Sequence, residues 1–236
     1  MANAVIVGAG VAGLTAGIRL RQAGVDCLIL EKHTRPGGEL TAWRRGAYLI
    51  DNCMHWLNGT LPGTRQNDLW RAVGMLDDRT ALCRSETFFQ CRLCDETLAF
   101  GRDTALLRRR MHELSPVDKK EIDALIDAVE AMASVFAPRD RRLLKRAASA
   151  VGTAGVMASL YVRYGTKSLF DLASRFRHPL LRMGLTGFLG GAFSAFAWLY
   201  AYGAFVAGDA DVPAGGSGEA AERMARRYAE LGGELR

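Results

Sequence analysis

The sequence predicts an α/β fold that begins with a Rossmann-like βαβ unit, on the basis of three observations near the N-terminus. An apolar run at Ala4–Val7, rich in β-branched residues, predicts a buried strand. The segment Gly8-Ala-Gly10-Val-Ala-Gly13 follows at once, and the pattern of Leu14–Gln22 predicts a helix behind it. A second apolar run, Cys27–Leu30, ends on the acidic residue Glu31. This order and spacing are typical of dinucleotide-binding units.

The three glycines of the loop are expected to have different physical roles. Gly8 allows a tight turn, Gly10 lets the backbone approach a pyrophosphate, and Gly13 lets the helix pack closely on the strand. The N-terminus of the helix, with its unpaired N–H groups and partial positive charge, meets the phosphates. The predicted cofactor-binding loop therefore comprises Gly8, Ala9, Gly10, Val11, Ala12 and Gly13.

Glu31 stands 18 residues after Gly13, at the tip of the second predicted strand. A carboxylate at this place suits the two hydroxyls of an adenosine ribose and disfavours a 2′-phosphate, so NADP is not expected here. The alternative is an ordinary βαβ unit whose glycine-rich turn binds no nucleotide.

The stretch Glu31-Lys-His-Thr-Arg-Pro-Gly37-Gly38 resembles the extended fingerprint of the flavin-dependent amine-oxidase and phytoene-desaturase superfamily. In that group a glycine pair lies against the FAD pyrophosphate and ribityl chain, where only glycine lets main chain run so close. Glu39 stands where the family usually has Arg. The resemblance implies that FAD is the cofactor. It also implies contacts to FAD from Glu31, Lys32, Gly37, Gly38 and Glu39.

The segments Pro36–Trp43 and Gly46–Gly59 are similar to a bacterial branch of the phytoene desaturase-like flavoproteins. That branch carries a Gly-Gly-Glu, a Trp and an Asp-x-Cys-x-His-Trp-Leu-x-Gly run. The resemblance implies that Asp51, His55 and Trp56 lie near the flavin. His55 is a candidate proton acceptor, since imidazole titrates near neutrality, and a hydrogen bond to the cofactor or backbone is its alternative role. Asp51 is alternatively a structural carboxylate.

The same resemblance implies a Rossmann-like FAD/NAD(P)-binding domain with an inserted, mostly helical α+β substrate domain. Residues 1–66 are expected to form the first part of the FAD-binding domain, 67–210 the inserted domain and 211–236 the return. The resemblance covers nearly all of this chain but only about the first half of the family. A fragment that is incomplete at its C-terminus is therefore expected.

Composition and cysteine usage are those of a folded globular protein. Hydrophobic residues make up 49% of the 236 residues and charged residues 24%. The first residues lack a basic n-region, so no secretory signal is expected, and the five cysteines are expected to be reduced thiols in the cytoplasm. Cys91 and Cys94 form a CxxC at strand period without a second pair, so neither a metal nor a redox role is predicted.

The chain is basic, with a formal net charge of +6 and an isoelectric point of about 9.3. Arginines and lysines gather at Arg108–Arg110 and Arg139–Arg146. No nucleic-acid motif accompanies them, and long apolar runs adjoin them. An anionic membrane surface is therefore the favoured partner, with peripheral association, and a solvated basic face is the alternative.

The middle of the chain shows one hairpin signal and two helix starts. Thr87–Phe100 alternates weakly around a turn at Asp95-Glu96. Ser115-Pro116 suits an N-cap and first helical position, and Ser168–Asp171 resembles a capping box. The first of these helices has an apolar stripe that comprises Ile122, Leu125, Ile126, Val129 and Phe136.

Met183–Ala207 is a run of 25 residues without a charge. Its aromatic side chains suit the wall of an apolar tunnel, and Gly187–Gly191 is expected to interrupt a single helix. A transmembrane span is the alternative, because the run is long enough to cross a bilayer.

The end of the chain is predicted to return to the nucleotide-binding domain. Val212–Gly218 is a glycine-rich entry to a helix over Glu219–Leu231. Glu234–Arg236 then reads as the first residues of a strand.

Three functional hypotheses remain open at this stage. The resemblance implies an FAD-dependent oxidoreductase that transfers a hydride between an apolar polyisoprenoid or carotenoid-type substrate and flavin. Another substrate within the superfamily is the second hypothesis, which includes amine oxidase, saturase and isomerase activities. A truncated, non-catalytic nucleotide-binding fragment is the third.

Overall fold

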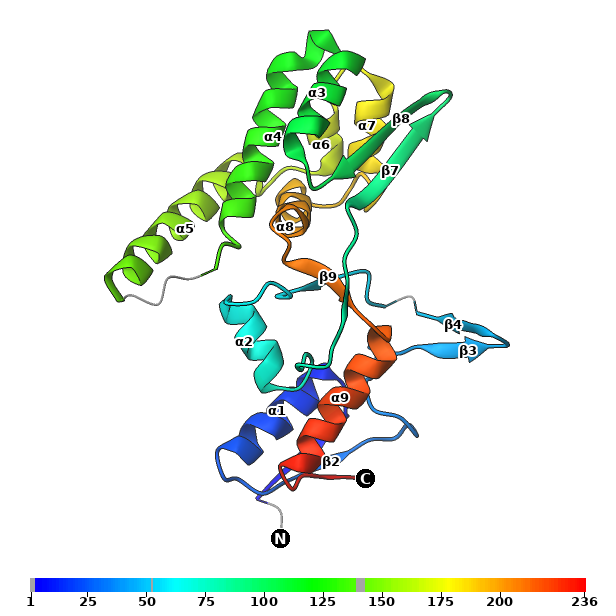
Figure 1. Ribbon diagram of the computed structural model, residues 1–236, viewed down its shortest axis with the longest axis vertical. Coiled ribbons are helices and arrows are strands. Elements are labelled where there is room, and N and C mark those ends of the chain that lie inside the picture. The colour runs from blue at the N-terminus through cyan, green and yellow to red at the C-terminus, as the bar shows by residue number, and fades with distance from the viewer. Residues whose placement is uncertain (1–2, 52, 139–142) are drawn as a thin grey trace. The chain divides into compact units, whose positions relative to one another are not determined.

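The computed structural model describes residues 3–51, 53–138 and 143–236, and for 143–149 the backbone alone. The chain divides into two compact units (Figure 1). Unit 1 runs to Arg84 and resumes at Asp211, whereas unit 2 is Ser85–Ala210. The first boundary therefore lies at residue 84, not at 66, because Val73 and Met75 are buried in the core of unit 1.

Unit 1 is an α/β layer with a short parallel sheet, and in Figure 1 it combines the blue and cyan N-terminal part with the red C-terminal helix. Its elements are β1 (Ala4–Val7), α1 (Val11–Gln22), β2 (Cys27–Leu30), β3 (Trp43–Arg45), β4 (Tyr48–Ile50), β5 (Leu57–Asn58), α2 (Arg65–Ala72), β6 (Leu82–Cys83), β9 (Ala210–Pro213), α9 (Gly216–Glu230) and β10 (Glu234–Leu235).

The parallel sheet has the order β1-β2-β10, with Ala4 opposite Cys27 and Glu234 opposite Leu28. The predicted strand at the end of the chain is thereby confirmed as a partner of β2. Helices α1 and α9 cover one face of this sheet, where Ile29 is fully buried. Val5 and other alternate side chains are exposed on the opposite face, because strand residues alternate between faces.

Two smaller pieces of sheet complete unit 1. The hairpin β3–β4 is antiparallel, and β5, β9 and β6 form a second sheet in that order. The backbone N–H of Asp211 donates to Thr60 Oγ1 at 3.1 Å, which ties the returning chain to the segment after β5. Residues 57–83 and the C-terminal segment therefore fold together.

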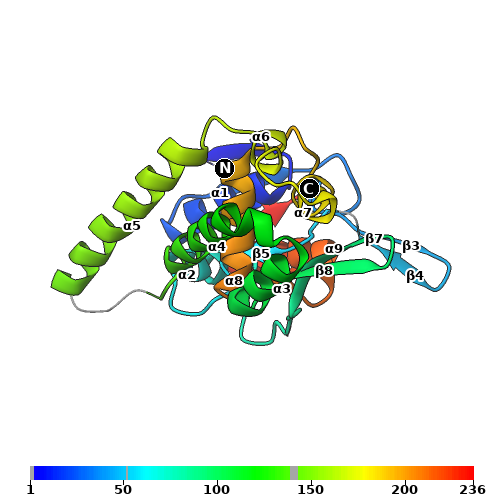
Figure 2. The same cartoon turned by 90° about the horizontal axis from the view of Figure 1, so that it is seen from above.

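Unit 2 is mostly helical and carries one β-hairpin, as expected for the inserted part. Figure 2 shows its helices from above. The elements are β7 (Thr87–Leu93), β8 (Glu96–Gly101), α3 (Thr104–Leu114), a 3-10 turn (Pro116–Asp118), α4 (Lys119–Ser134), α5 (Leu143–Tyr164), α6 (Leu169–Ala173), α7 (Pro179–Thr186) and α8 (Ala195–Val206).

The core of unit 2 forms between α4, α8 and the hairpin. The predicted stripe on α4 is confirmed, since Ile122, Ile126 and Val129 are fully buried. Trp198 and Tyr202 of α8 are also fully buried, and the Tyr202 hydroxyl donates to the Gly101 carbonyl at 2.6 Å. Trp198 and Tyr202 therefore serve as core rather than as the wall of an open tunnel.

Local sequence signals set the ends of several elements of unit 2. The hairpin turns at Cys94, which has φ +53°, and the capping box at Ser168 and Asp171 is present as predicted. The uncharged run breaks into α7 and α8, with Gly190 at φ +84° between them. No helix of the described residues is long and apolar enough to cross a membrane.

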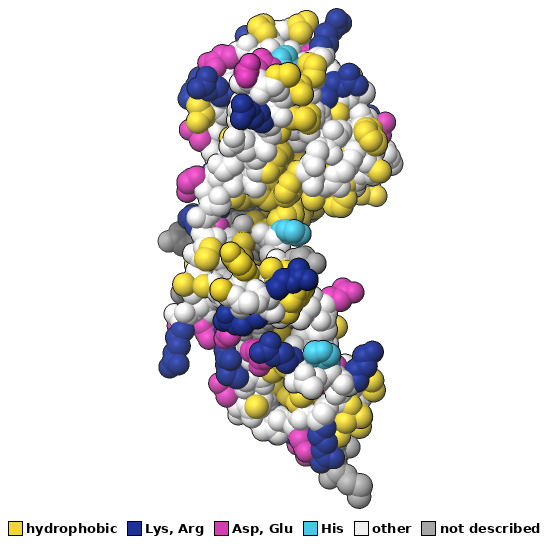
Figure 3. All heavy atoms as spheres, turned by 90° about the vertical axis from the view of Figure 1, so that its right-hand side faces the viewer, with side chains coloured by type: hydrophobic (Ala, Val, Ile, Leu, Met, Phe, Trp, Pro, Cys, Tyr) yellow, Lys and Arg dark blue, Asp and Glu magenta, His cyan; other side chains and the backbone are white. Residues whose placement is uncertain are grey.

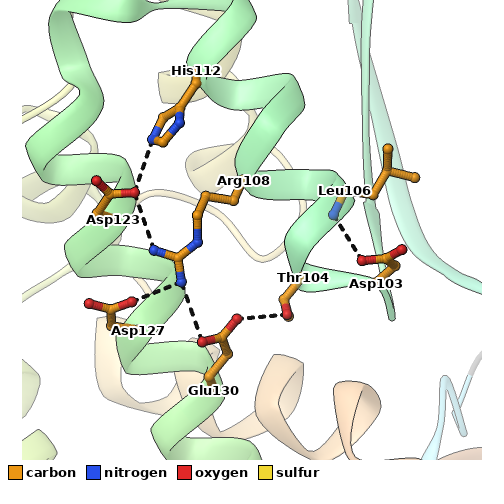
Figure 4. A network of polar contacts seen from close by, with 8 residues as sticks. All are labelled: Asp103, Thr104, Leu106, Arg108, His112, Asp123, Asp127 and Glu130. Carbon is orange, nitrogen blue, oxygen red and sulfur yellow. Dashed lines mark hydrogen bonds and ion pairs between the residues drawn. The ribbon is translucent and has the colours of Figure 1, made fainter.

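Helix α3 was not predicted. It places Arg108, from the predicted basic cluster Arg108–Arg110, against acidic side chains of α4. The Arg108 guanidinium lies 3.2 Å from Asp123, 2.8 Å from Asp127 and 3.3 Å from Glu130, all on α4 (Figure 4). His112 Nε2 lies 3.0 Å from the same Asp123 oxygen. Arg108 is therefore an α3–α4 bridge rather than part of a free basic face.

Helix α5 projects from the rest of unit 2 in both views (Figures 1 and 2). Several of its apolar side chains are exposed, among them Val151 (74%), Tyr161 (59%) and Val162 (83%). The second predicted basic cluster, Arg139–Arg146, lies before and within the start of this helix, and its side chains fall outside the described residues.

Candidate dinucleotide-binding site

The glycine loop between β1 and α1 gives each glycine a distinct environment. Gly8 has φ +97°, a conformation that favours glycine, and its N–H donates to the Leu30 carbonyl at 2.7 Å. A Cβ on Gly13 would overlap the carbonyl oxygen of Gly8. A Cβ on Gly10 would meet only the Gly37 carbonyl oxygen, at 3.9 Å. Gly8 and Gly13 thus serve the fold, whereas Gly10 keeps one side of the loop open.

Helix α1 begins at this loop without a side-chain cap. Its N-cap is Gly10, with φ −71° and ψ 177°, and no side-chain cap hydrogen bond is made there among the residues that the structure describes. The first N–H groups of a helix have no intrahelical partner and carry partial positive charge, so this end suits an anion such as a phosphate. Ala9 is fully buried behind the loop, and Ala12 is exposed on it.

Glu31, at the end of β2, is held against the glycine loop. Its carboxylate accepts hydrogen bonds from the backbone N–H groups of Ala9 at 2.6 Å and His33 at 3.0 Å. The hydrogen bond from the His33 N–H, and next the one from the Ala9 N–H, lower the pKa of Glu31. Burial raises this pKa, but its effect is smaller, so the pKa stays below its usual value. The group is therefore an anion at neutral pH, beside the turn where a nucleotide ribose is expected. Lys32 is exposed next to it.

The second glycine pair lies directly on the first loop. The Gly37 N–H donates to the Ala9 carbonyl at 2.8 Å, and a Cβ on Gly38 would come within 3.3 Å of the Gly10 Cα. On its other side, a Cβ on Gly37 would stand 2.9 Å from the Ala221 Cβ of α9. Two glycine turns and the start of α9 thus meet at one place. Glu39, two residues after Gly37, is exposed.

Asp51 follows β4 and caps α9 from a distance of 166 residues in sequence. Its carboxylate accepts from the Ser217 N–H at 2.5 Å and from the Ser217 hydroxyl at 2.7 Å, and the Met54 N–H donates to Ser217 Oγ at 3.0 Å. Burial raises the pKa of Asp51, but the hydrogen bonds from Ser217 and Cys53 outweigh it and lower the pKa. Asp51 therefore has a structural role here. Sequence reasoning missed Ser217, for which the Gly-Gly-Ser-Gly helix entry was the available signal.

His55 and Trp56 lie in the loop that leads to β5. The His55 side chain is exposed, and its ring centroid is 6.2 Å from that of Trp56, at an interplanar angle of 42°. The loop thus brings these two rings together, while the Asp51 carboxylate is engaged at α9. Their contact with a flavin stays a prediction.

Replacing Asp51 with alanine removes the acceptor for the first turn of α9. We expect the free energy of unfolding to fall by about 1–2 kcal/mol, the usual effect of losing a charged helix cap. Because the folded pKa is lowered, the stabilisation by Asp51 is present above the unfolded pKa of about 4 and is lost as pH falls through the folded pKa. Urea denaturation at several pH values measures both effects. Asp51→Asn is the control, and an unchanged stability of Asp51→Ala at pH 7 would contradict the cap.

Comparisons with known proteins agree with this geometry. Residues 6–73 match the family of NAD(P)-binding Rossmann-like domains. The chain is 30% identical over 121 residues to the lycopene-forming phytoene desaturase of Pseudescherichia vulneris, a match that covers 50% of this chain and 24% of the desaturase. It is also 30% identical over 123 residues to polyamine oxidase 6 of Oryza sativa subsp. japonica, covering 49% of this chain and 23% of that relative. The matches thus span about a quarter of each relative.

Solved structures share the fold over nearly the whole chain. Wild-type putrescine oxidase bound to putrescine superposes with a TM-score of 0.56 at 20% identity, over 99% of this chain and 50% of that one. An oxidoreductase from Methanosarcina mazei gives a TM-score of 0.55 at 16% identity, again over 99% and 50%. Residues 6–73 therefore carry an NAD(P)-binding Rossmann-like domain, and the N-terminal half of the chain is similar in sequence to a phytoene desaturase and to a polyamine oxidase. The solved structures show that the fold of the whole chain is shared with about half of putrescine oxidase.

Proposed function

We propose that the protein binds FAD on unit 1 and oxidises an apolar, polyisoprenoid-type substrate. The observation that carries the cofactor assignment is the packing of Gly37-Gly38 on Gly10, beside the Glu31 carboxylate. An ordinary nucleotide turn needs only the first glycine loop. A second backbone turn that is free of side chains leaves room for a cofactor extended beyond its pyrophosphate.

The residues of unit 1 fit FAD in three respects. Gly10 and the uncapped N-terminus of α1 suit the pyrophosphate, and Glu31 suits the adenosine ribose. The anionic Glu31 also disfavours a 2′-phosphate. The flavin, when bound, supplies hydride acceptance, while the protein binds, orients and excludes water.

An apolar substrate is supported by aromatic side chains of unit 2 that are only partly buried. Phe188 stacks on Phe89 with centroids 4.7 Å apart and meets Phe88 at 5.1 Å. Phe188 and Phe193 remain 36% and 42% exposed. Hydrophobic side chains gather on the upper part of the molecule in Figure 3, which is unit 2. A hydrocarbon offers no polar handle, so apolar shape must supply its specificity.

In the proposed reaction, a carbon–carbon single bond becomes a double bond. A flavin held by unit 1 would supply the hydride acceptor for one carbon, and a base would take the proton from its neighbour. His55 is the proposed proton acceptor, because it is an exposed imidazole on a loop of unit 1.

Oxidation of an amine is the second candidate, since polyamine oxidase 6 matches as much of the chain as the desaturase does. Loading the protein with FAD and adding each substrate without oxygen separates the two. A colourless polyisoprenoid in lipid vesicles is expected to bleach the flavin absorption near 450 nm (approximate value for an oxidised flavin), and putrescine or spermidine is not. Bleaching by an amine alone would contradict the proposed substrate class.

The exposed apolar side chains of α5 support peripheral membrane association. Val151 and Val162 are exposed, and Arg163 follows them on the same helix. Such a surface inserts shallowly among lipid headgroups. Co-sedimentation with anionic vesicles, reduced in Val162→Asp, is the expected result. If as much Val162→Asp as wild-type protein sediments with the vesicles, or if the wild type sediments equally without vesicles, the proposed association is contradicted.

A further inference from the structure

A hollow of about 440 Å³ lies on unit 1 between the end of α2, the loop after it and the second half of α9. Four arginines line it, with three acidic residues and two others: Arg71, Gly74, Leu76, Asp77, Asp78, Arg223, Arg226, Arg227 and Glu230. The Tyr228 hydroxyl on the same stretch of α9 donates to the Cys27 carbonyl at the start of β2. The hollow is thus at the edge of the sheet where strands begin, whereas the glycine loop follows the end of β1.

Arg223 is a buried cation that has an unused donor in this hollow. Its side chain is among the buried charged groups, with 7% of the residue exposed. The Nε–H donates to the Met75 carbonyl at 3.1 Å, but Nη2 makes no hydrogen bond to any residue that the structure describes. Buried charges in proteins are normally paired, because removing an isolated charge from water is unfavourable.

Asp77 is the carboxylate whose charge acts most on Arg223, and its oxygens already accept hydrogen bonds within its own turn. Asp77 accepts from the Thr80 hydroxyl at 2.6 Å and from the Arg79 N–H at 3.0 Å, which closes its own turn. The negative charge of Asp77 favours the charged form of Arg223 through space. Asp77 does not accept a hydrogen bond from Arg223 Nη2. Burial accordingly lowers the pKa of Arg223, with only partial compensation from Asp77.

The remaining arginines are held in exposed, weak pairs. Arg71 pairs with Asp78 at 2.8 Å, Arg226 with Glu219 at 2.8 Å and Arg227 with Glu230 at 3.3 Å. Each acidic partner is at least 47% exposed. Exposed ion pairs of this kind contribute little to stability, so an incoming anion can share or replace them.

The backbone of the loop permits this gathering of guanidinium groups. Gly74 has φ +74°, and a Cβ there would come within 2.6 Å of the Arg227 Cβ. A glycine therefore lets the loop after α2 lie directly against α9. Arg223, Arg226 and Arg227 follow helical spacing of three and four residues and project from one side of that helix.

We propose that this hollow is a phosphate-binding site, separate from the dinucleotide site, with the Arg223 Nη2 group as its buried anchor. Guanidinium groups present several planar N–H donors and suit the tetrahedral oxygens of a phosphate. The ligand is either free inorganic phosphate or the phosphate of a small ester. The proposal does not rest on the proposed oxidoreductase function.

Calorimetric titration of the full chain with inorganic phosphate, and separately with glycerol 1-phosphate, tests the site. Ionic strength is held constant with KCl. A separate titration with acetate tests whether the site binds a carboxylate as well as it binds phosphate. Arg226→Gln removes an exposed guanidinium from the hollow, and Arg19→Gln, an exposed arginine of α1, is its matched control. Arg223→Met removes the anchor. Gly10→Ala reports on phosphate that binds at the glycine loop instead.

We expect phosphate binding by the wild type, weakened about tenfold in Arg223→Met and clearly in Arg226→Gln, and unchanged in Arg19→Gln and Gly10→Ala. If Arg223→Met does not fold, the Arg226→Gln and Arg19→Gln pair decides. The tighter of the two phosphate ligands identifies the source. No binding by the wild type, equal binding of acetate, or loss in Gly10→Ala alone would each overturn the assignment.

Discussion

Gly13→Ala is expected to destabilise unit 1 by about 3 kcal/mol, the upper part of the range for overpacked sites. The added methyl group would overlap the Gly8 carbonyl oxygen and lie 3.3 Å from the Ile6 side chain, so helix α1 has to move away from β1. Since backbone cannot relax as a flexible side chain does, the cost falls on the whole βαβ unit. Urea denaturation followed by circular dichroism measures the change.

Gly155→Ala provides the matched control for this substitution. It makes the same chemical change on α5, where a Cβ would meet no atom of the described residues within 4 Å. Helix propensity alone then favours alanine by up to about 1 kcal/mol, so this variant is expected to be as stable as the wild type or slightly more so. Equal stability of Gly13→Ala and Gly155→Ala would contradict the close helix–strand packing.

Asp118→Ala is expected to lower the free energy of unfolding by about 3 kcal/mol. The Asp118 carboxylate is 4% exposed and accepts from the Ser115 hydroxyl at 2.7 Å, the Arg177 N–H at 2.8 Å and the His178 N–H at 3.2 Å. Alanine leaves two backbone N–H groups of unit 2 without this acceptor, and unmet buried donors cost about 1–3 kcal/mol each. Thermal and urea unfolding measure the loss.

The Asp118 carboxylate makes the stability of unit 2 depend on pH. Burial raises the pKa of Asp118, but hydrogen bonds from Ser115, Arg177 and His178 outweigh it and lower the pKa. Its contribution is therefore present above the unfolded pKa of about 4 and is lost as pH falls through the folded pKa. Asp118→Asn, which keeps one acceptor oxygen, is expected to lose less than Asp118→Ala at pH 7. If the destabilisation by Asp118→Ala is the same at pH 7 as at a pH below the folded pKa of Asp118, the charge contributes nothing.

Elements specified by neighbouring residues were predictable from the sequence. Strands β1 and β2 have the predicted bounds, because short apolar runs end at glycine or an acidic residue. The capping box at Ser168 needs only residues three apart. The Rossmann-like unit and its glycine turns follow from the same local spacing, which is why the resemblance to flavoproteins was visible in the first 60 residues.

Contacts between distant segments were not predictable. The run around Arg108 carries no periodic apolar signal strong enough to show a helix, and its acidic partners lie 15 to 22 residues away on α4. Asp51 and Ser217 meet over 166 residues, and Arg223 meets Met75 over 148. Pairings of this kind depend on the fold, so the sequence showed charged residues without showing what each one contacts.

The absorption spectrum of the purified full chain, taken after adding FAD and removing the excess, tests the central assignment most directly. The wild type is expected to retain flavin bands near 370 and 450 nm (approximate values for bound oxidised flavin). Gly10→Ala is expected to fold, since its Cβ has 3.9 Å to the nearest atom, yet to retain at least about tenfold less FAD because the methyl group stands on the open side of the loop. A wild type that stays colourless, or equal retention by Gly10→Ala, would contradict a flavin seated on this glycine loop.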